Sequence, residues 1–382
     1  MGGKGSKANI EPSKEKVIGA AGEEMHTYND GAFKRVREAA GVADDFLMDG
    51  FDFRLKTDGG KMKEGGGKGG NLMGFTDNMM FIVKELNDTD HNTLLLYASE
   101  YANHMTHADG SLLCKILAHF WNPQNRLNYM VMNNVIPDPP VNAGIMTTEK
   151  SVTKGASRST TGSANNRALE GGVEDGRVSM MKHRKSAFDL KGCNDDKILV
   201  EDGEGIDEVH KRIWHVHMWC GKCCWSDERK RYHDGKTRAK SQKFHITAQQ
   251  KDQLLKWLRA SVTFLVQRNL MDYSLMVSSQ VVDVNDAAAQ ELQAAYQVRG
   301  SDLVKSDFPF ISKHDGKLQV LHVGIIDFLQ DWTCTKNIAM CIKIFERNKA
   351  TVPPATYGAR FIRHFTDNFV ADAEPAQPLR GL

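Results

Sequence analysis

Apolar residues recur at helical spacing in three stretches of the chain, at 32–42, 88–105 and 246–269. The third stretch is the most amphipathic, because its apolar residues form a single stripe at Leu254, Leu255, Leu258, Val262, Leu265 and Val266. Thr247 and Gln250 have the spacing of a capping box, which predicts where this helix begins. The segment 111–120 continues the pattern of the second stretch, so we expect it to be helical as well.

Runs of β-prone residues predict four strands, at 78–86, 128–136, 186–193 and 317–332. Lys84 lies near the end of the first strand, which follows a glycine-rich stretch at 58–75. The last run is almost continuous and rich in β-branched residues, which predicts a buried strand, and Asp327 stands at its end.

Shifts in composition divide the chain. Residues 1–27 form a tail rich in glycine, lysine and serine without an apolar period. From 137 to about 185, small and polar residues replace the large apolar ones, which predicts a long flexible insertion. We therefore expect a first lobe over 28–243 that carries this insertion, and a second lobe over 244–375.

The bulk composition is that of a soluble globular protein, with 41% hydrophobic and 26% charged residues among 382. The net charge of +2 excludes a strongly basic nucleic-acid binder, so only the local basic clusters at 182–185 and 227–243 are candidates for an acidic partner. Each cluster is equally typical of a solvated surface. The seven cysteines without a secretory signal favour reduced thiols in the cytoplasm, and no apolar run is long enough to span a membrane.

The amino terminus changes the expectation about membranes. "MGGKGSK" fits the N-myristoylation pattern, with Gly2 as the acceptor and Ser6 at the hydroxyl position. A single myristoyl chain binds membranes only marginally, so the neighbouring lysines would add an electrostatic attraction to an anionic leaflet. This interpretation predicts a peripheral protein at the cytoplasmic face, with the plasma membrane favoured. The alternative is a plain flexible tail.

The stretch "RNLMDYSLMV", residues 268–277, interrupts an apolar segment with a carboxylate at Asp272. Burying a carboxylate is costly unless it is paired, binds a metal or lies at the edge of a site. In chain order, the glycine-rich stretch, Lys84, Asp272 and Asp327 form the set that phosphoryl transfer requires, because its transition state calls for positioning and charge neutralisation.

Each member of this set has a candidate role. The backbone of Gly67, Gly69 and Gly70 would cover the phosphates of ATP, and Lys84 would bind them as a point charge. Asp327 would hold Mg²⁺, and Asp272 would orient or deprotonate the attacking hydroxyl. Singly, each is also typical of a turn or of a solvated surface. The chain lacks the Walker pattern and the HRD and DFG triplets, which argues against an ordinary protein kinase.

A second cluster of candidate ligands occurs at 210–225, where Cys220 and Cys223 have the CxxC spacing of a zinc site beside His215 and His217. The alternation of histidines with apolar residues is also typical of a half-exposed strand. No second ligand pair lies elsewhere in the sequence, so the strand is the favoured interpretation and zinc stays an alternative.

Five segments together resemble the phosphatidylinositol phosphate kinase family, in particular its phosphatidylinositol 4-phosphate 5-kinases. "LMDYSLMV" is similar to the MDYSLL motif, "AFDLKGC" to the DLKGS strand and "GIIDFLQDW" to the IIDxLQxY strand. "VPPATYGARF" and "GFTDNMMFIVKEL" match two further motifs in the same order, and the likeness covers residues 33–369. The resemblance implies an α+β, two-lobed lipid kinase fold distantly related to protein kinases, with an antiparallel sheet in the N-terminal lobe.

The resemblance also implies roles and partners. Asp272 and Lys191 would be catalytic, Lys84 would bind ATP, and Asp327 would bind Mg²⁺. Four basic residues would contact the lipid phosphates, namely Lys336, Lys343, Arg347 and Lys349. The expected reaction phosphorylates a phosphatidylinositol monophosphate in an anionic membrane, most readily the 4-phosphate at its 5-hydroxyl, with the 5-phosphate as the near alternative. A homodimer is left open.

Two departures from the family keep other functions open. Asn337 stands where a second lysine is usual, and Ala339 where a glutamate is usual. A phosphoinositide-binding scaffold with weakened catalysis is therefore one alternative, and a soluble inositol phosphate kinase is another.

Overall fold

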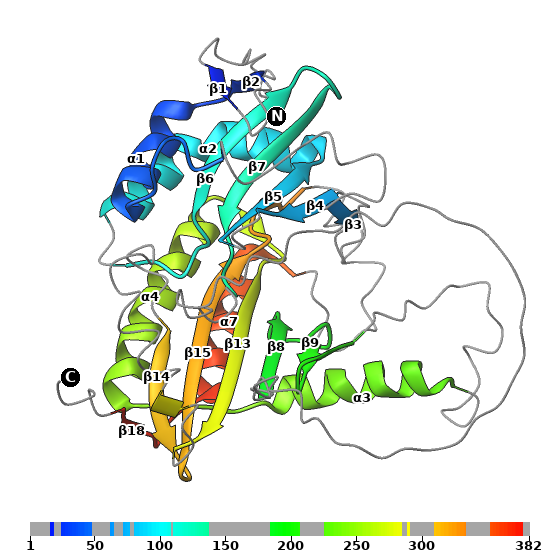
Figure 1. Ribbon diagram of the computed structural model, residues 1–382, viewed down its shortest axis with the longest axis vertical. Helices are drawn as coiled ribbons and strands as arrows, with labels where there is room; N and C mark the ends of the chain where they lie inside the picture. Colours follow the sequence, from blue (N-terminus) through cyan, green and yellow to red (C-terminus); the bar gives the residue numbers. More distant parts are fainter. Residues whose placement is uncertain are drawn as a thin grey trace, which may run out of the picture.

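The computed structural model describes residues 16–18, 24–47, 62–64, 72–76, 80–107, 110–136, 184–206, 225–284, 289–290, 309–333 and 352–376 (Figure 1). These residues form two seven-stranded sheets and two small two-stranded ones, with helices packed beside them. Both large sheets are antiparallel throughout. The predicted mixture of helices with antiparallel strands is therefore confirmed.

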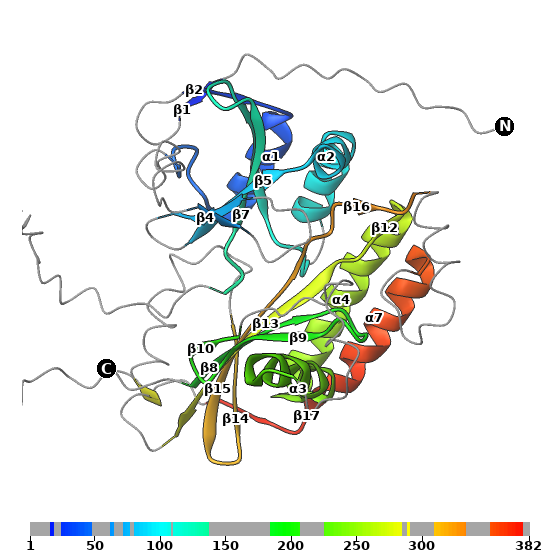
Figure 2. The same cartoon turned by 90° about the vertical axis from the view of Figure 1, so that its right-hand side faces the viewer.

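The first large sheet has the strand order β1-β2-β6-β7-β5-β4-β3. Its strands are β1 (Lys16–Ile18), β2 (Glu24–Thr27), β3 (Met62–Glu64), β4 (Leu72–Phe75), β5 (Phe81–Leu86), β6 (Ile116–Asn122) and β7 (Leu127–Asn133). Helices α1 (Asp30–Ala40) and α2 (Asp88–His107) pack against each other on one side of this sheet (Figure 2). The predicted helices at 32–42 and 88–105 and the predicted strands at 78–86 and 128–136 are thus confirmed.

The second large sheet has the strand order β10-β9-β8-β13-β15-β14-β18. Its strands are β8 (Arg184–Leu190), β9 (Lys197–Glu201), β10 (Glu204–Gly205), β13 (Ser274–Asp283), β14 (Phe310–His314), β15 (Lys317–Ile326) and β18 (Glu374–Pro375). On sequence we grouped residues 184–205 with the first lobe. Strand pairing instead places them in the second sheet, because β8 pairs with β13 over its whole length.

Three helices lie on one side of the second sheet, α3 (Asp227–Ser241), α4 (Ala248–Gln267) and α7 (Pro354–Asn368) (Figure 2). The capping box at the start of α4 is confirmed, since Thr247 and Gln250 exchange hydrogen bonds between side chain and backbone. Two short pairs complete the fold: β11 (Phe244–Ile246) runs parallel to β17 (Phe369–Ala371), and β12 (Leu270–Met271) runs antiparallel to β16 (Gln330–Asp331).

The expectation of a helix over 111–120 is wrong. Helix α2 ends at His107, and Gly110 has a φ of 120°, at which a side chain would lie against Trp257 of α4. Residues 116–122 form β6, and Ile116, Leu117 and Phe120 are all buried. Continuous burial produces an unbroken apolar run in a strand, which periodicity cannot distinguish from a buried helix.

A single cluster of buried side chains includes residues of both large sheets. The segment between α2 and β6 connects the sheets directly, because the backbone N–H of Cys114 donates to the carbonyl of Ile325 in β15 at 2.9 Å. Tyr101 of α2 stacks on Phe328, which follows β15, with 5.9 Å between ring centroids. Among the helices described, none has the length and apolar character needed to cross a bilayer.

Candidate active site

Two neighbouring strands are interrupted at the same level of the second sheet. Strands β13 and β15 pair as far as Ser274 and Ile326, and pairing resumes beyond the interruption between β12 and β16. The residues that leave the ladder include Asp272 and Asp327, with φ angles of 66° and 57°. A left-handed backbone is uncommon for a residue other than glycine, so both aspartates are held in an unusual conformation at one place.

Lys84 of β5 joins the first sheet to Asp327. Its Nζ lies 2.6 Å from Oδ1 of Asp327, and the two side chains are 19% and 47% exposed. Burial alone would lower the pKa of Lys84, but the ion pair with Asp327 outweighs burial and raises it. Burial would likewise raise the pKa of Asp327, and the charge of Lys84 lowers it instead. Both groups are therefore charged at neutral pH.

Lys191 forms a second pair with Asp272. Its Nζ donates to Oδ1 of Asp272 at 2.7 Å and to the main-chain carbonyl of the same residue at 3.0 Å. Burial acts to lower the pKa of Lys191, and the negative charge of Asp272 raises it overall. Lys191 also lowers the pKa of Asp327, so the two ion pairs belong to one electrostatic site.

A buried aspartate shapes the turn that carries Lys191. Asp196 is fully buried, and its Oδ1 accepts the backbone N–H of Lys191 at 2.6 Å and that of Cys193 at 3.2 Å. Burial raises the pKa of Asp196 to about 6 in spite of these donors. Sequence reasoning missed this residue. The signal was the second of two aspartates after the turn-forming "GCN", where a side chain can accept hydrogen bonds from its own turn.

Cys193 stands where the DLKGS strand of the resembling family has a serine. The sulfur of Cys193 accepts the backbone N–H of Asp195 at 3.5 Å. The thiol is buried, and burial raises its pKa to about 11, so it is protonated at neutral pH. A weak acceptor in the turn has thus replaced a stronger one.

The residues after Asp272 support it from the core. Tyr273 and Ser274 are completely buried, and the Tyr273 ring packs edge-on against Tyr357 and Phe361 of α7. The Tyr357 hydroxyl donates to the main-chain carbonyl of Tyr273. The backbone beside Asp272 is therefore fixed by helix α7.

Asp90 is a further acidic residue near the site that sequence reasoning did not single out. It lies in the first turn of α2, where Asn87 donates to its carboxylate at 3.2 Å. Burial raises the pKa of Asp90, the charge of Asp327 raises it further and Lys84 opposes both. An aspartate in the first turn of a helix is common without any role in a site, so the sequence alone did not point to it.

The structure thus brings together Lys84, Lys191, Asp272 and Asp327 from four separate segments. The other predicted site residues lie outside the described part of the chain, namely Gly2, Gly67, Gly69, Gly70, Lys336, Lys343, Arg347 and Lys349. The same holds for the insertion at 137–183 and for the cysteines and histidines of 210–224. Strands β3 and β4 flank the glycine-rich residues and pair antiparallel, and β4 pairs with β5 beside Lys84.

Two comparisons with known proteins bear on the sequence that carries this site. The family profile described as Phosphatidylinositol-4-phosphate 5-Kinase matches residues 58–161 and 177–368 of the chain. All four charged residues of the site fall within these ranges. A protein of Plasmodium falciparum (isolate 3D7) has the name Phosphatidylinositol 4-phosphate 5-kinase. It is 25% identical to this chain over an alignment of 134 residues, and the match covers 31% of this chain. The matched region spans 8% of the length of that relative.

Proposed function

Because the chain belongs to the Phosphatidylinositol-4-phosphate 5-Kinase family, we propose that it transfers the γ-phosphate of ATP to the 5-hydroxyl of phosphatidylinositol 4-phosphate. The observation that carries the proposal is the meeting of two lysine–aspartate pairs, Lys84–Asp327 and Lys191–Asp272, at one interruption of the second sheet. We further propose that the two sheets are the two lobes of a kinase-like fold.

Lys84 is the residue that binds the phosphates of ATP in this proposal. It is charged, only partly exposed and carried by a strand next to the β3–β4 pair. Phosphate oxygens offer Lys84 an acceptor of the same charge type as Asp327, so binding exchanges one charge-assisted hydrogen bond for another. Little free energy is then lost when the lysine leaves the aspartate.

Asp327 has the properties of a Mg²⁺ ligand. Its carboxylate is 47% exposed and is kept ionised by Lys84 and Lys191, and carboxylate oxygens are the donors that Mg²⁺ prefers. The ion neutralises phosphate charge when it is bound. Asp327 contributes the carboxylate at a fixed place in the site, because it directly follows the buried strand β15.

Asp272 orients the attacking hydroxyl and accepts its proton. The hydroxyl oxygen bonds to the γ-phosphorus while the bond from that phosphorus to the β–γ bridging oxygen breaks, and ADP leaves. Lys191 holds the Asp272 carboxylate in place and adds a positive charge where negative charge spreads over the transferred group. Catalysis here depends mainly on charges positioned in advance.

The membrane context is part of the same proposal. The substrate lies in an anionic bilayer, and the basic tail with Gly2 would bring the chain to the cytoplasmic face of the plasma membrane. Lys336, Lys343, Arg347 and Lys349 would contact the phosphates of the lipid. No nucleic acid takes part, and a homodimer is compatible with this arrangement.

The test uses the full chain, radiolabelled ATP and vesicles that contain phosphatidylserine with each phosphatidylinositol monophosphate in turn. We expect labelled bisphosphate from the 4-phosphate. Asp272→Asn should reduce turnover by about 10²-fold or more, since it removes a proton acceptor, and should leave ATP binding measurable. Asp283→Asn is the matched control, because Asp283 is an exposed residue at the other end of β13.

Other results would reject the proposal in specific ways. Vesicle binding without transfer of label would indicate a scaffold. Phosphorylation of a soluble headgroup with no gain from vesicles would indicate a soluble inositol phosphate kinase. Near-normal turnover of Asp272→Asn would remove Asp272 from the mechanism.

A further inference from the structure

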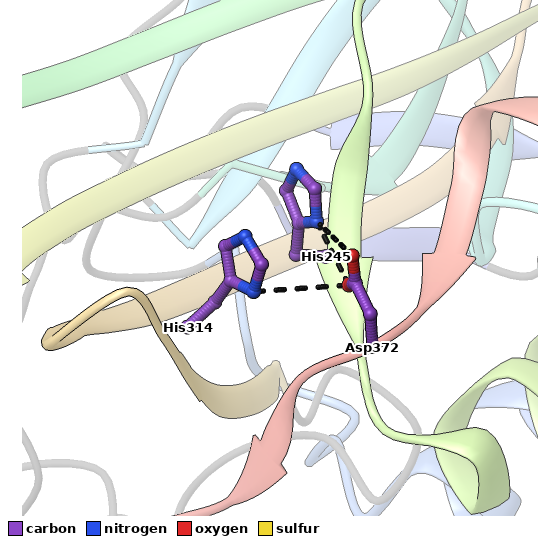
Figure 3. A group of neighbouring side chains, drawn as sticks. All are labelled: His245, His314 and Asp372. Atoms are coloured by element: carbon purple, nitrogen blue, oxygen red, sulfur yellow. Dashed lines mark hydrogen bonds and ion pairs between the residues drawn. The ribbon is translucent and has the colours of Figure 1, made fainter.

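Three side chains with metal-binding atoms meet at the far end of the second sheet. His245 comes from β11, His314 from the end of β14, and Asp372 from the residue after β17 (Figure 3). Strand β15 begins beside His314 and ends at Ile326, next to Asp327, so its ten residues place this cluster about 30 Å from the candidate active site. The cluster is therefore separate from the residues proposed for phosphoryl transfer.

The three ligand atoms already face one another. Nδ1 of His245 lies 2.8 Å from Oδ1 of Asp372, and Nδ1 of His314 lies 3.8 Å from the same oxygen. The two imidazole rings are stacked, with 3.8 Å between centroids and 7° between planes. Donor atoms around a tetrahedral Zn²⁺ are about 3.4 Å apart, given metal–ligand distances of about 2.1 Å. Both separations lie close to that value.

The backbone around the cluster is fixed by pairing of three strands. His245 is in register with Val370 of β17, and its carbonyl accepts the Ser312 hydroxyl of β14 at 2.9 Å. Strand β18 then pairs with β14, with Ser312 opposite Pro375. The backbone positions of the ligands are thus fixed, and binding requires the two rings to turn out of their parallel stack so that both Nδ1 lone pairs meet at one ion.

The orientation of His314 has a further cause. Its Nε2 lies 3.4 Å from a carboxylate oxygen of Asp315, on the side of the ring away from Asp372. A carboxylate on the distal nitrogen of a metal-binding histidine fixes the tautomer in which the other nitrogen is free to coordinate. Asp315 and Gly316 form the tight turn between β14 and β15, with φ angles of 48° and 71°, which fixes the backbone next to His314.

We propose that His245, His314 and Asp372 bind a zinc-class divalent ion that ties β11, β14 and the β17–β18 end of the chain together. Two imidazoles and a carboxylate are a ligand set that suits Zn²⁺, and they leave one position for water. A cavity of about 450 Å³ adjoins the cluster, and its lining includes both histidines and Lys317.

The first test is titration of the metal-free full chain with Zn²⁺ by calorimetry and with Co²⁺ by visible absorption. We expect one Zn²⁺ equivalent whose affinity falls at least about 100-fold in His314→Gln and in Asp372→Asn. Asp315→Asn should lower the Zn²⁺ affinity by about 10–100-fold and keep the Co²⁺ spectrum, because Asp315 acts only through the orientation of His314. His107→Gln, at an exposed histidine of α2, is the matched control and should bind normally.

Two further variants separate this site from other metal ligands in the chain. The double substitution Cys220→Ser/Cys223→Ser removes the thiolates of the 210–225 segment, and Asp327→Asn removes the proposed Mg²⁺ ligand. We expect both to keep this equivalent, and the Co²⁺ complex to show no thiolate charge-transfer band. The proposal would be overturned if either variant lost the bound Zn²⁺ equivalent while His314→Gln kept it. The absence of saturable Zn²⁺ binding to the wild-type chain would also overturn it.

The expected consequence of binding is greater stability at the carboxyl-terminal end. Zn²⁺ should raise the melting temperature of the wild type and of His107→Gln, because a ligand that binds only the folded state stabilises it. It should not raise that of His314→Gln or Asp372→Asn. Equal shifts in all four proteins would contradict a site at these residues.

Discussion

At the scale of single residues, the candidate site depends on charges that are paired before any substrate binds. Asp272 and Asp327 each have a lysine as partner, so neither carboxylate is left unpaired. Asp196 differs from them. Its Oδ1 accepts backbone N–H groups, but no hydrogen bond reaches its Oδ2 in the described structure, and the nearest charge partner is His364 at 3.5 Å.

The raised pKa of Asp196 gives a prediction about stability and pH. A carboxyl whose pKa is about 6 when folded and near 3.8 when unfolded stabilises the fold below pH 4, and this contribution is lost as the pH rises through 6. Asp196→Asn keeps an oxygen for the N–H groups of Lys191 and Cys193 and removes the charge. Its stability relative to wild type should therefore increase between pH 4 and pH 7.5 by about 3 kcal/mol at most.

Urea denaturation of both proteins at several pH values measures this difference. Burial lowers the pKa of His364 to about 4, so that group titrates over the same range, but it is present in both proteins and largely cancels. Asp195→Asn changes an exposed residue of the same turn and should leave stability nearly unchanged. A difference between Asp196→Asn and wild type that does not vary with pH would contradict the prediction.

The sequence pattern pointed to Lys84, Asp272 and Asp327, because each follows or belongs to a recognisable element, and the family resemblance added Lys191. Lys84 was found from a strand after a glycine-rich stretch, and Asp327 from the end of a buried run. The pairing of Lys191 with Asp272 was beyond the sequence, since 81 positions separate the two residues and only the fold brings them together. Asp196 was missed because a buried carboxylate and a surface turn residue look alike in sequence.

At the scale of elements, helix α7 supports the site through its close approach to α4. A Cβ atom at Gly358 would lie 2.7 Å from Val266 and 2.8 Å from Val262, both on α4. The neighbouring Tyr357 donates to the carbonyl of Tyr273, one residue after Asp272. The spacing between the two helices therefore controls the backbone that carries the catalytic candidate.

Gly358→Ala should destabilise the protein by about 1–3 kcal/mol, since the added methyl group overpacks the α4–α7 contact. Gly235→Ala in α3 is the matched control. A Cβ there meets nothing within 4 Å, and replacing glycine inside a helix should stabilise by about 0.5–1 kcal/mol. Denaturation midpoints measure both effects.

A second substitution shows whether the overpacking is the cause. Val262→Ala combined with Gly358→Ala should recover part of the lost stability, because it removes the side chain that the new methyl group meets. We expect the free energy of unfolding to fall in Gly358→Ala and to rise in Gly235→Ala. A rise in Gly358→Ala would show that α4 and α7 move apart without loss of stability.

Most elements could be predicted because their patterns were local. The capping box and apolar stripe of α4 and the β-branched run of β15 lie within single segments. Strand β6 could not be predicted, because almost all of its residues are buried against α1 and the neighbouring strands and it shows no alternation of apolar and polar residues. The assignment of β8–β10 to the second sheet depends on pairing with β13, which lies far along the chain and has no local signature.

At the scale of the whole molecule, the two sheets meet close to Asp327. The hydroxyl of Tyr101 donates to the carbonyl of Cys114 at 2.7 Å and accepts the N–H of Ile116 at 2.8 Å, while its ring stacks on Phe328. Tyr101 of α2 therefore contacts Phe328, the residue directly after Asp327, and we call this contact the joint between the two sheets. The distance from Lys84 to Asp327 depends on this joint.

Tyr101→Phe should cost about 1–3 kcal/mol, because it removes two hydrogen bonds that the buried hydroxyl makes with the main chain of Cys114 and Ile116. We expect lipid kinase activity to fall as well, since the joint positions Asp327. Tyr28→Phe removes a phenol that donates to Asn128 in the first sheet, away from the joint, and is the matched control. A loss of activity that is equal in the two variants would argue against a positional role for the joint.

The left-handed backbone at Asp272 and Asp327 has a consequence beyond the reaction itself. Such a conformation costs about 1 kcal/mol or more at a residue with a side chain, and glycine would relieve it. Asp202 and Asp315 adopt the same conformation in turns, so the backbone alone does not mark a catalytic residue. The lysine partners of Asp272 and Asp327 are what distinguish these two positions. In a relative that does not carry out the proposed reaction, we expect glycine at 272 or 327 to be accompanied by loss of the partner lysine.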